Sequence, residues 1–218
     1  MRKVYLSVEG QGDEAALPNL LSRLASSMAL EVPAFPIAHR LARCTEADVG
    51  RQCEDLRRLA NADGERFAGA MFLRDDEDGC PKRDAPLIAE WVRRQKLPFP
   101  VAVVLFYREY ETMFVATLGA LAAKQLRDKS MRELVALDET AKEPADPEAY
   151  RDAKGYVSRF LPKKHPYRET THQYAMTVAL NVDVLRASGL PCVGSLERGL
   201  RFVLTESSGV YPPASAST

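Results

Sequence analysis

Residues 67–81 read FAGAMFLRDDEDGCP, and this stretch decides the predicted fold. The run 67–73 is apolar without the alternation of a half-buried strand, which is typical of a strand covered on both faces of a parallel sheet. Two further runs have the same character: KVYLSV at 3–8 and FPVAVVLF at 99–106. The sequence therefore predicts a mainly parallel sheet that contains these three strands.

Helical patterns separate the predicted strands. Apolar residues at helical spacing over 17–28 predict a helix with Pro18 in its first turn, where the missing N–H costs little. Thr45 and Asp48 resemble a capping box and predict a helix that ends near Leu59. Strands that alternate with helices in this way are typical of an α/β fold with helices on both faces of the sheet. Further helices are expected over 81–96, 109–123, 147–161, 169–188 and 195–206, and a weak strand over 35–41.

We expect a single domain over residues 1–206. The alternating part, about 1–125, forms its core, and a helical C-terminal elaboration follows over about 147–206. The segment 138–148, DETAKEPADPE, is linker-like in composition, so the helices after it either return to the sheet or form a unit of their own. We expect them to pack on the sheet because their apolar faces need cover. Residues 207–218, SSGVYPPASAST, are mostly small, include two prolines and carry no side-chain charge. We expect them to be disordered.

The charge balance gives no global signal for nucleic acid. Thirty Lys and Arg residues balance thirty Asp and Glu residues, so any contact with phosphates must come from a local patch. Candidate patches are Arg57 with Arg58, Arg93 with Arg94, and the run at 163–165, each of which is also typical of a solvated surface. No apolar run reaches the roughly 18 residues of a membrane span, and the start of the chain does not resemble a signal peptide. These features predict a cytoplasmic protein.

The cysteines exclude the common zinc sites. Cys44, Cys53, Cys80 and Cys192 form no CxxC pair, and no histidine lies at a ligand spacing from them. Disulfides are rare in cytosolic proteins, so buried thiols are the expected state.

Acidic residues follow three of the predicted strands. Glu9 ends the first strand, the run 75–78 (DDED) ends the second, and Glu109 and Glu111 follow the third. Because the carboxyl ends of parallel strands share one edge of a sheet, we expect these acids to lie together. Clustered carboxylates repel, and a bound Mg²⁺ would remove that repulsion. Taken singly, each acid has a simpler interpretation, as part of a solvated loop or as a favourable charge at a helix N-terminus.

The ordered set of motifs resembles a known family. It comprises Glu9-Gly10-Gln11-Gly12-Asp13, the acidic stretch from Asp75 to Pro81, Arg108-Glu109-Tyr110-Glu111, and Ala153-Lys154-Gly155, with Thr171-His172-Gln173 and Ser195-Leu196 further on. These motifs resemble the Toprim domain of topoisomerases, primases and OLD-type nucleases, and more closely a family of small bacterial Toprim-like proteins. The resemblance spans nearly the whole chain. It implies a Toprim-like parallel sheet and a site that depends on Mg²⁺ or Mn²⁺.

The resemblance also implies roles for individual residues. Glu9 matches the Toprim glutamate, which acts as general acid or base or as a metal ligand, and Asp13 matches the second acid of that motif. Lys154 would stabilise charge on a phosphate, or is a plain surface lysine. Glu111 would add a ligand. The DxD motif has two registers, one with Asp76 and Asp78 and the other with Asp75 and Glu77.

Two functions remain open at this point. The first is a metal-dependent nuclease or related phosphoryl-transfer protein that acts on nucleic acid, as the resemblance implies. Since the chain has no GxxxxGK[ST] loop, an ATPase would be a separate partner, as in a multi-protein system of defence against phage or plasmids. The second is a non-catalytic binding or adaptor protein with a Toprim-like fold, which the neutral charge favours.

Overall fold

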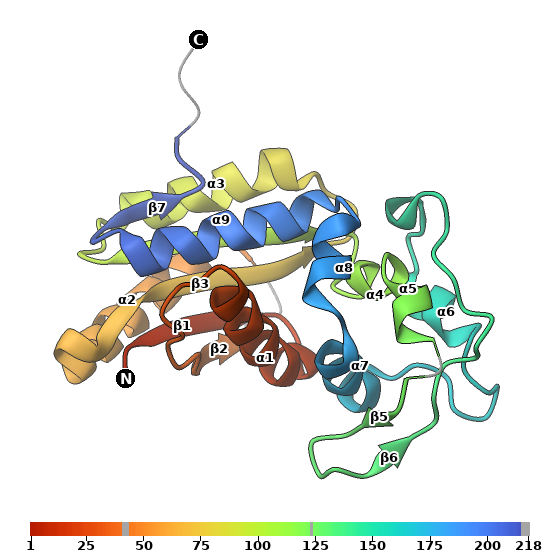
Figure 1. The fold of residues 1–218 in the computed structure, drawn as a ribbon. Coiled ribbons are helices and arrows are strands. Elements are labelled where there is room, and N and C mark those ends of the chain that lie inside the picture. Colours follow the sequence, from red (N-terminus) through yellow and green to blue (C-terminus); the bar gives the residue numbers. More distant parts are fainter. Residues whose placement is uncertain (41–43, 123, 215–218) are drawn as a thin grey trace.

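The computed structural model describes residues 1–40, 44–122 and 124–214. Figure 1 shows a twisted sheet between two layers of helices, with a second lobe beside it. The strands are β1 (Lys3–Val8), β2 (Ile37–Arg40), β3 (Phe67–Asp76), β4 (Pro100–Tyr107), β5 (Leu126–Arg127), β6 (Glu133–Leu134) and β7 (Gly209–Tyr211). The helices are α1 (Gln11–Ser27), α2 (Glu46–Asp63), α3 (Pro81–Arg94), α4 (Thr112–Val115), α5 (Leu118–Leu121), α6 (Ala153–Ser158), α7 (Tyr174–Ala179), α8 (Val182–Ala187) and α9 (Pro191–Thr205), with short turns at η1 (Gly64–Arg66), η2 (Pro147–Ala149) and η3 (Glu169–Gln173).

The main sheet is parallel throughout, which confirms the predicted fold class. Its strand order is β2-β1-β3-β4-β7, and the register pairs Leu6 with Met71 and Phe72 with Val103. This α/β arrangement is consistent with a Toprim-like fold. The three strands predicted from continuous apolar runs lie side by side at its centre, because only central strands are covered on both faces.

Each face of the sheet has its own core. On one face Leu6, Met71 and Val104 pack against α1 and α9, and on the other face Phe72 and Val103 pack against α2 and α3. Successive side chains of a strand point to opposite faces, so neighbouring residues of β3 and β4 belong to different cores. The same alternation decides which acids at the strand ends face which way.

Helix α1 begins earlier than the sequence predicts. It starts at Gln11, because Asp13 accepts a hydrogen bond from the Gly10 N–H (2.9 Å) and so closes the first turn. Pro18 consequently lies inside the helix, and its assignment to the first turn was wrong. The early start matters for the site, since it places Asp13 directly after β1.

The C-terminal half is less regular than predicted. Helix α9 lies on the sheet, where a Cβ at Gly199 would come within 3.2 Å of Ala102 Cβ. The helices expected over 109–123, 147–161 and 169–188 are instead several short helices and turns. These form, with the β5–β6 hairpin, the lobe at the carboxyl edge of the sheet (Figure 1). The short segments turn so that polar residues between them reach that edge.

The expected disorder of 207–218 is corrected in part. Residues Gly209–Tyr211 form β7, which pairs with Pro100–Ala102 at the edge of the sheet. The backbone of an edge strand needs a partner on one side only, so a segment of three residues suffices. Residues 215–218 of the tail, residue 41 of the weak strand and residue 123 at the end of the predicted helix 109–123 lie outside the described residues.

The sequence also predicts buried thiols and no helix that spans a membrane. Cys53 and Cys192 are buried free thiols, whereas Cys44 is half-buried and Cys80 is exposed, so the expectation of burial holds for two of the four. Among the described residues, no helix combines the length and the apolar character needed to cross a membrane.

The packing of α1 gives a test of the fold. Leu24 is fully buried against the sheet, whereas Leu87 on α3 is 49% exposed. We expect Leu24→Ala to lower the free energy of unfolding by about 2–5 kcal/mol, because it leaves a cavity. Leu87→Ala should change it by about 0.5 kcal/mol or less. Urea unfolding followed by circular dichroism measures both, and equal effects would contradict the described core.

Candidate active site at the carboxyl edge of the sheet

Carboxylates from three strand ends meet at the carboxyl edge of the sheet. Glu9 follows β1, Asp13 lies in the first turn of α1, Asp75 is near the end of β3, and Glu111 precedes α4. The charges of Glu111, Asp13 and Glu9 all act on Asp75, which places Asp75 among the other three. The clustering predicted from the strand ends is therefore present for these four residues.

Asp75 is the central acid. Its Oδ1 accepts a hydrogen bond from the Tyr110 N–H (2.8 Å), which ties the end of β3 to the segment after β4. Burial raises the pKa of Asp75 well above its ordinary value, and the neighbouring carboxylates of Glu111, Asp13 and Glu9 raise it further. A carboxyl group in this environment gains much from a cation.

Asp13 is held in a fixed orientation. One oxygen accepts from the Gly10 N–H, and the other accepts from Gln173 Nε2 (2.7 Å). The residue is buried, and burial raises its pKa despite these two hydrogen bonds. Gln173 thus positions a carboxylate that lies 160 residues away in sequence.

Glu111 is almost completely buried. Its side chain is 1% exposed, and its Oε1 accepts a hydrogen bond from the Tyr167 hydroxyl (2.7 Å). Its other oxygen, Oε2, is buried with no hydrogen-bond partner among the described residues. Burial raises the pKa of Glu111 to about 7, against the opposing effects of Lys154 and Tyr167.

Lys154 supplies a positive charge to the cluster. Its ammonium lies 3.3 Å from Glu109 Oε1, 3.7 Å from Glu169 Oε2 and 3.9 Å from Glu111 Oε2. Burial opposes the charged form, but Glu111 and Glu109 outweigh it and raise the pKa of Lys154. Lys154 therefore remains an ammonium, and the interpretation as a plain surface lysine does not fit its surroundings.

Glu9 lies at the outer side of the cluster. Its Oε2 is 3.3 Å from Arg74 Nη2, and the same oxygen is buried without a hydrogen-bond partner among the described residues. Burial raises the pKa of Glu9, and Arg74 and the Asp75 N–H lower it. Both Glu9 and Glu111 thus have an oxygen that a further ligand would satisfy.

The structure separates the two registers of the acidic run. Asp76 points to the other face of β3, where the charge of Asp84 adds to the effect of burial on its pKa, and Asp78 pairs with Arg151 at the surface. Adjacent strand residues alternate between faces, and the acids whose charges act on Glu9 are Asp13 and Glu77, so the register with Asp75 and Glu77 is the one beside Glu9. Asp76 Oδ2 is also buried without a hydrogen-bond partner among the described residues, and the register with Asp76 and Asp78 stays a prediction. Glu77 is on the side of Asp75, and its charge raises the pKa of Glu9.

Four further residues complete the cluster, and of these only Glu109 was expected from the sequence. Glu109 accepts hydrogen bonds from the Ala153 and Lys154 N–H groups, and Glu169 accepts one from the Gly12 N–H (3.3 Å). Tyr167 and Gln173 are the donors already described. Glu169 and Gln173 are both in η3, a wide turn that no local pattern predicts. The Thr171-His172-Gln173 motif was the available signal.

Comparison with known proteins gives one family. A family model described as a domain of unknown function, DUF4276, matches residues 8–201. The chain belongs to this family. No curated protein and no solved structure matches the chain. The matched region runs from the end of β1 to α9, so in this DUF4276 chain it includes all the acids of the cluster.

The chemistry of the cluster fits a hard divalent cation. Carboxylate oxygens are the preferred ligands of Mg²⁺, and two of those present are buried without a partner. Among the described residues, no group of three or more His, Cys, Asp and Glu side chains is arranged to hold a metal ion as it stands. Mg²⁺ in phosphoryl-transfer sites needs only one or two carboxylates, with water and substrate phosphates as its other ligands.

The burial of Glu111 makes stability depend on pH. The folded state keeps the Glu111 proton up to about pH 7, whereas the unfolded state loses it near the ordinary value of 4.5. The free energy of unfolding of the metal-free protein should therefore fall as pH rises from about 4.5 to about 7, by roughly 2–3 kcal/mol. Glu111→Gln should reduce this slope, because the amide does not titrate.

Urea unfolding at several pH values measures the effect. Glu139→Gln is the matched control, since Glu139 is exposed and is not one of the main groups that act on Glu111, and it should leave the slope unchanged. A slope that is the same in wild type and Glu111→Gln would contradict the described burial of Glu111.

Proposed function

We propose that this protein is a Mg²⁺-dependent nuclease, or a related phosphoryl-transfer protein, with a Toprim-like site. The observation that carries the proposal is the position of Asp75, which is half-buried and lies within range of the charges of Glu9, Asp13 and Glu111 at the carboxyl edge of the sheet. Charges of one sign are costly to bury together, and a structural role would be served as well by neutral side chains. A cation with phosphate ligands accounts for their arrangement.

Glu9 and Asp75 are the residues that would hold Mg²⁺ or Mn²⁺. They end the adjacent strands β1 and β3, and Asp13 lies beside them as a further acid. The bound ion would supply an activated water and a charge to stabilise the leaving oxygen. In this proposal Lys154 stabilises negative charge on the phosphate from the opposite side of the cluster, while Tyr167 holds Glu111 in place.

A small cavity beside the cluster combines an aromatic ring with a cation, although Glu14, Asp128 and Glu169 also line it. It has a volume of about 290 Å³ and is lined by Gly12 and Glu169 on the side of the acids. On its other side Lys129, from the turn of the β5–β6 hairpin, lies 5.8 Å from the centre of the Tyr174 ring. An aromatic ring with a nearby cation is the combination that stacks a base and contacts its phosphate.

The basic pairs named from sequence are less suited to this role. Arg58 pairs with Asp55, Arg93 with Glu90, and Arg94 with Glu46, so these charges already have partners. Arg57 donates to the Gln95 carbonyl. The hairpin beside the cluster is therefore the better candidate for contact with a substrate.

The biological setting follows from the same proposal. A cytoplasmic effector of defence against phage or plasmids would need a partner to supply the ATPase activity that this chain lacks in its sequence. Such a partner would regulate access of nucleic acid to the cluster.

A non-catalytic adaptor is the second candidate function. The contacts of Lys154 and Arg74 favour it, because two cations of the chain already lie beside the acids. An adaptor would use the neutralised cluster to hold the lobe on the sheet. The two functions differ in whether the protein binds a divalent cation.

Asp75→Asn, with Asp76→Asn as its matched control, tests the proposed function. Asp75 lies in the cluster and Asp76 on the opposite face of the same strand. We expect millimolar Mg²⁺ or Mn²⁺ to raise the melting temperature of wild type and of Asp76→Asn, but not that of Asp75→Asn. Without metal, Asp75→Asn should melt no lower than wild type, because it relieves repulsion.

Cleavage provides the second measurement. Wild type with Mn²⁺ should cleave single-stranded DNA or RNA, and Asp75→Asn and Glu9→Gln should each reduce the rate by about a hundredfold or more. If calorimetry shows no metal binding by wild type and Glu9→Gln lowers its stability, the adaptor function is correct and the nuclease proposal fails.

A further inference from the structure

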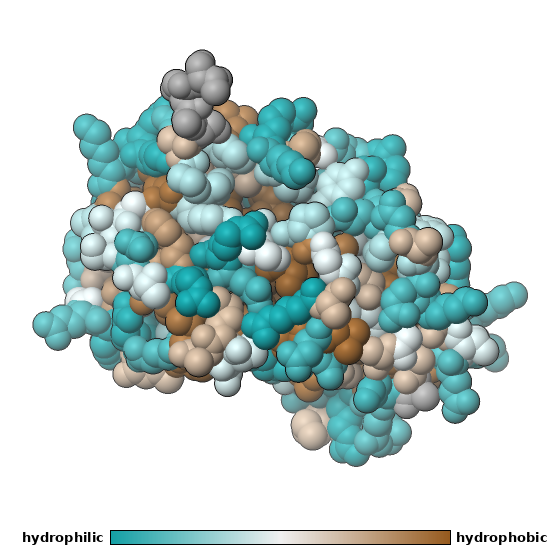
Figure 2. All heavy atoms as spheres, turned by 45° about the horizontal axis from the view of Figure 1, so that its top comes forward, coloured by the Kyte–Doolittle hydropathy of each residue, from teal (hydrophilic) through white to brown (hydrophobic). Residues whose placement is uncertain are grey.

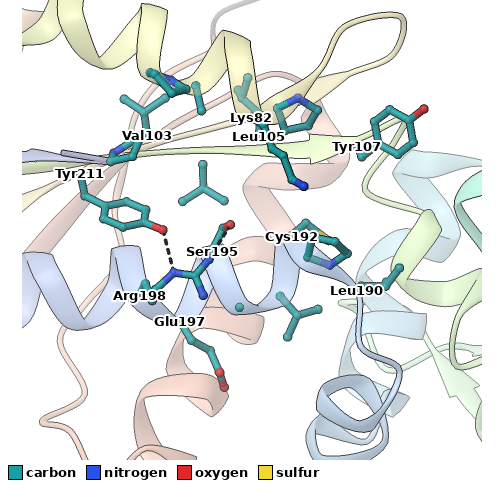
Figure 3. A pocket seen from close by; sticks show the side chains of 18 of the residues that line it. Lys82, Val103, Leu105, Tyr107, Leu190, Cys192, Ser195, Glu197, Arg198 and Tyr211 are labelled. Atoms are coloured by element: carbon teal, nitrogen blue, oxygen red, sulfur yellow. Dashed lines mark hydrogen bonds between the residues drawn. The ribbon is translucent and has the colours of Figure 1, made fainter. Parts of the chain in front are cut away.

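The cations of this protein differ in their surroundings. Figure 2 shows hydrophilic side chains spread over one face of the molecule. Arg198 lies beside a cavity of about 620 Å³ between α3 and α9, and it donates there to a neutral partner, the Tyr211 hydroxyl (3.0 Å, Figure 3). The ammonium of Lys154, in contrast, lies within 4 Å of three carboxylates. We call these side chains the glutamate cluster, and they are Glu109, Glu111 and Glu169.

Glu109 and Glu169 each turn one carboxylate oxygen to the ammonium, while the backbone holds the other. Oε2 of Glu109 accepts a hydrogen bond from the Ala153 N–H (3.0 Å), and its Oε1 lies 3.3 Å from Lys154 Nζ. Oε1 of Glu169 accepts a hydrogen bond from the Gly12 N–H (3.3 Å), and its Oε2 lies 3.7 Å from Nζ. One oxygen of each residue is therefore directed to the same point.

Glu111 has the same arrangement and is buried. Its Oε1 accepts a hydrogen bond from the Tyr167 hydroxyl (2.7 Å), and its Oε2 lies 3.9 Å from Lys154 Nζ. This distance is too long for a hydrogen bond, and Oε2 has no other hydrogen-bond partner among the described residues although the side chain is only 1% exposed. A buried polar atom without a partner is costly, so this oxygen faces a position that a closer cation would fill.

The ammonium fits the glutamate cluster loosely. Its distances to the three oxygens are 3.3, 3.7 and 3.9 Å, whereas a hydrogen bond from an ammonium to a carboxylate is usually about 2.7–2.9 Å long. Ca²⁺ binds carboxylate oxygens at about 2.3–2.6 Å, so each oxygen would move inward by about 1–1.5 Å to bind it. Carboxylates and water are the ligands that a hard divalent cation prefers, and Ca²⁺ tolerates irregular geometry.

We propose that the glutamate cluster is a divalent-cation site whose place the ammonium of Lys154 occupies in the wild-type protein. Glu109, Glu111 and Glu169 are its ligands, and a hard cation such as Mn²⁺ or Ca²⁺ binds there when the ammonium is removed. The lysine thus supplies a fixed positive charge that needs no metal.

The use of this charge rests on the proposed function. With one ion at Glu9 and Asp75, the ammonium would be the second positive charge that a two-ion site places beside the phosphate. The protein would then need one divalent ion for each reaction site in place of two.

The test counts bound Mn²⁺ by isothermal titration calorimetry and electron paramagnetic resonance. We expect Lys154→Ala to bind one Mn²⁺ per chain more than wild type, because the ammonium no longer fills the glutamate cluster. Lys154→Arg keeps the positive charge and should bind as many ions as wild type. The matched control is Lys164→Ala, which removes an exposed lysine and should also leave the number unchanged.

Two double variants locate the added ion. Lys154→Ala with Glu169→Gln should bind it about tenfold more weakly or worse, because one ligand has lost its charge. Asp75→Asn with Lys154→Ala should still bind it, because Asp75 is not a member of the glutamate cluster.

Thermal melts in the Asp75→Asn background give a measurement that needs no cleavage. Without metal, adding Lys154→Ala should lower the melting temperature, because Glu111 then lies buried beside two other carboxylates without a cation. Millimolar Ca²⁺ or Mn²⁺ should raise it again. If Lys154→Ala does not fold without metal, refolding from urea with and without millimolar Mn²⁺ replaces the melt, and we expect native circular dichroism only with the metal.

Three results would overturn the proposal. They are a Lys154→Ala variant that binds no more Mn²⁺ than wild type, an equal gain of Mn²⁺ by Lys154→Arg, and failure of Lys154→Ala to fold both with and without metal. If wild type binds no Mn²⁺ and Lys154→Ala binds one, the nuclease proposal fails and the glutamate cluster is still a cation site. If each of them binds one, the nuclease proposal stands and this inference fails.

Discussion

The ammonium of Lys154 is the contact on which the arrangement of the site depends. It lies within 4 Å of Glu109 and Glu111, which are in the segment between β4 and α4, and of Glu169, which is in η3. These segments have little regular structure of their own, so their apolar contacts alone do not fix where each polar group lies. Lys154 is half-buried, whereas Glu111 is buried, so removal of Lys154 would leave the Glu111 carboxylate without a nearby positive charge. Lys154 thereby joins the lobe to the edge of the sheet.

The sheet imposes the complementary constraint. Alternation along β3 turns Asp75 toward the cluster and Asp76 toward Asp84, although the two residues are chemically equivalent. The hydrogen bond from the Tyr110 N–H to Asp75 then ties the segment after β4 to β3. The packing of the strand therefore fixes the position of a side chain at its end. The register of the whole sheet decides which of the two aspartates faces the cluster.

The predictable part of this structure is the part that local pattern decides. The central strands, α2 and α3 follow from apolar periodicity and from the capping box at Thr45, and the edge at which the acids meet follows from parallel pairing. The start of α1 was not predicted correctly, because it depends on the hydrogen bond from the Gly10 N–H to the Asp13 carboxylate. Glu169 and Gln173 were not identified, since their place in the site depends on contacts with residues about 160 positions away. Strand β7 was missed because its pairing with β4 requires little apolar character of its own.

Strand β4 fixes where the two glutamates of the cluster lie. It pairs with β3 over Val101–Tyr107, and its carboxyl end leads directly to Glu109 and Glu111. Its other edge pairs with β7 over Pro100–Ala102. The segment that carries the two glutamates begins one residue beyond Tyr107, so the positions of both carboxylates depend on the register between β3 and β4.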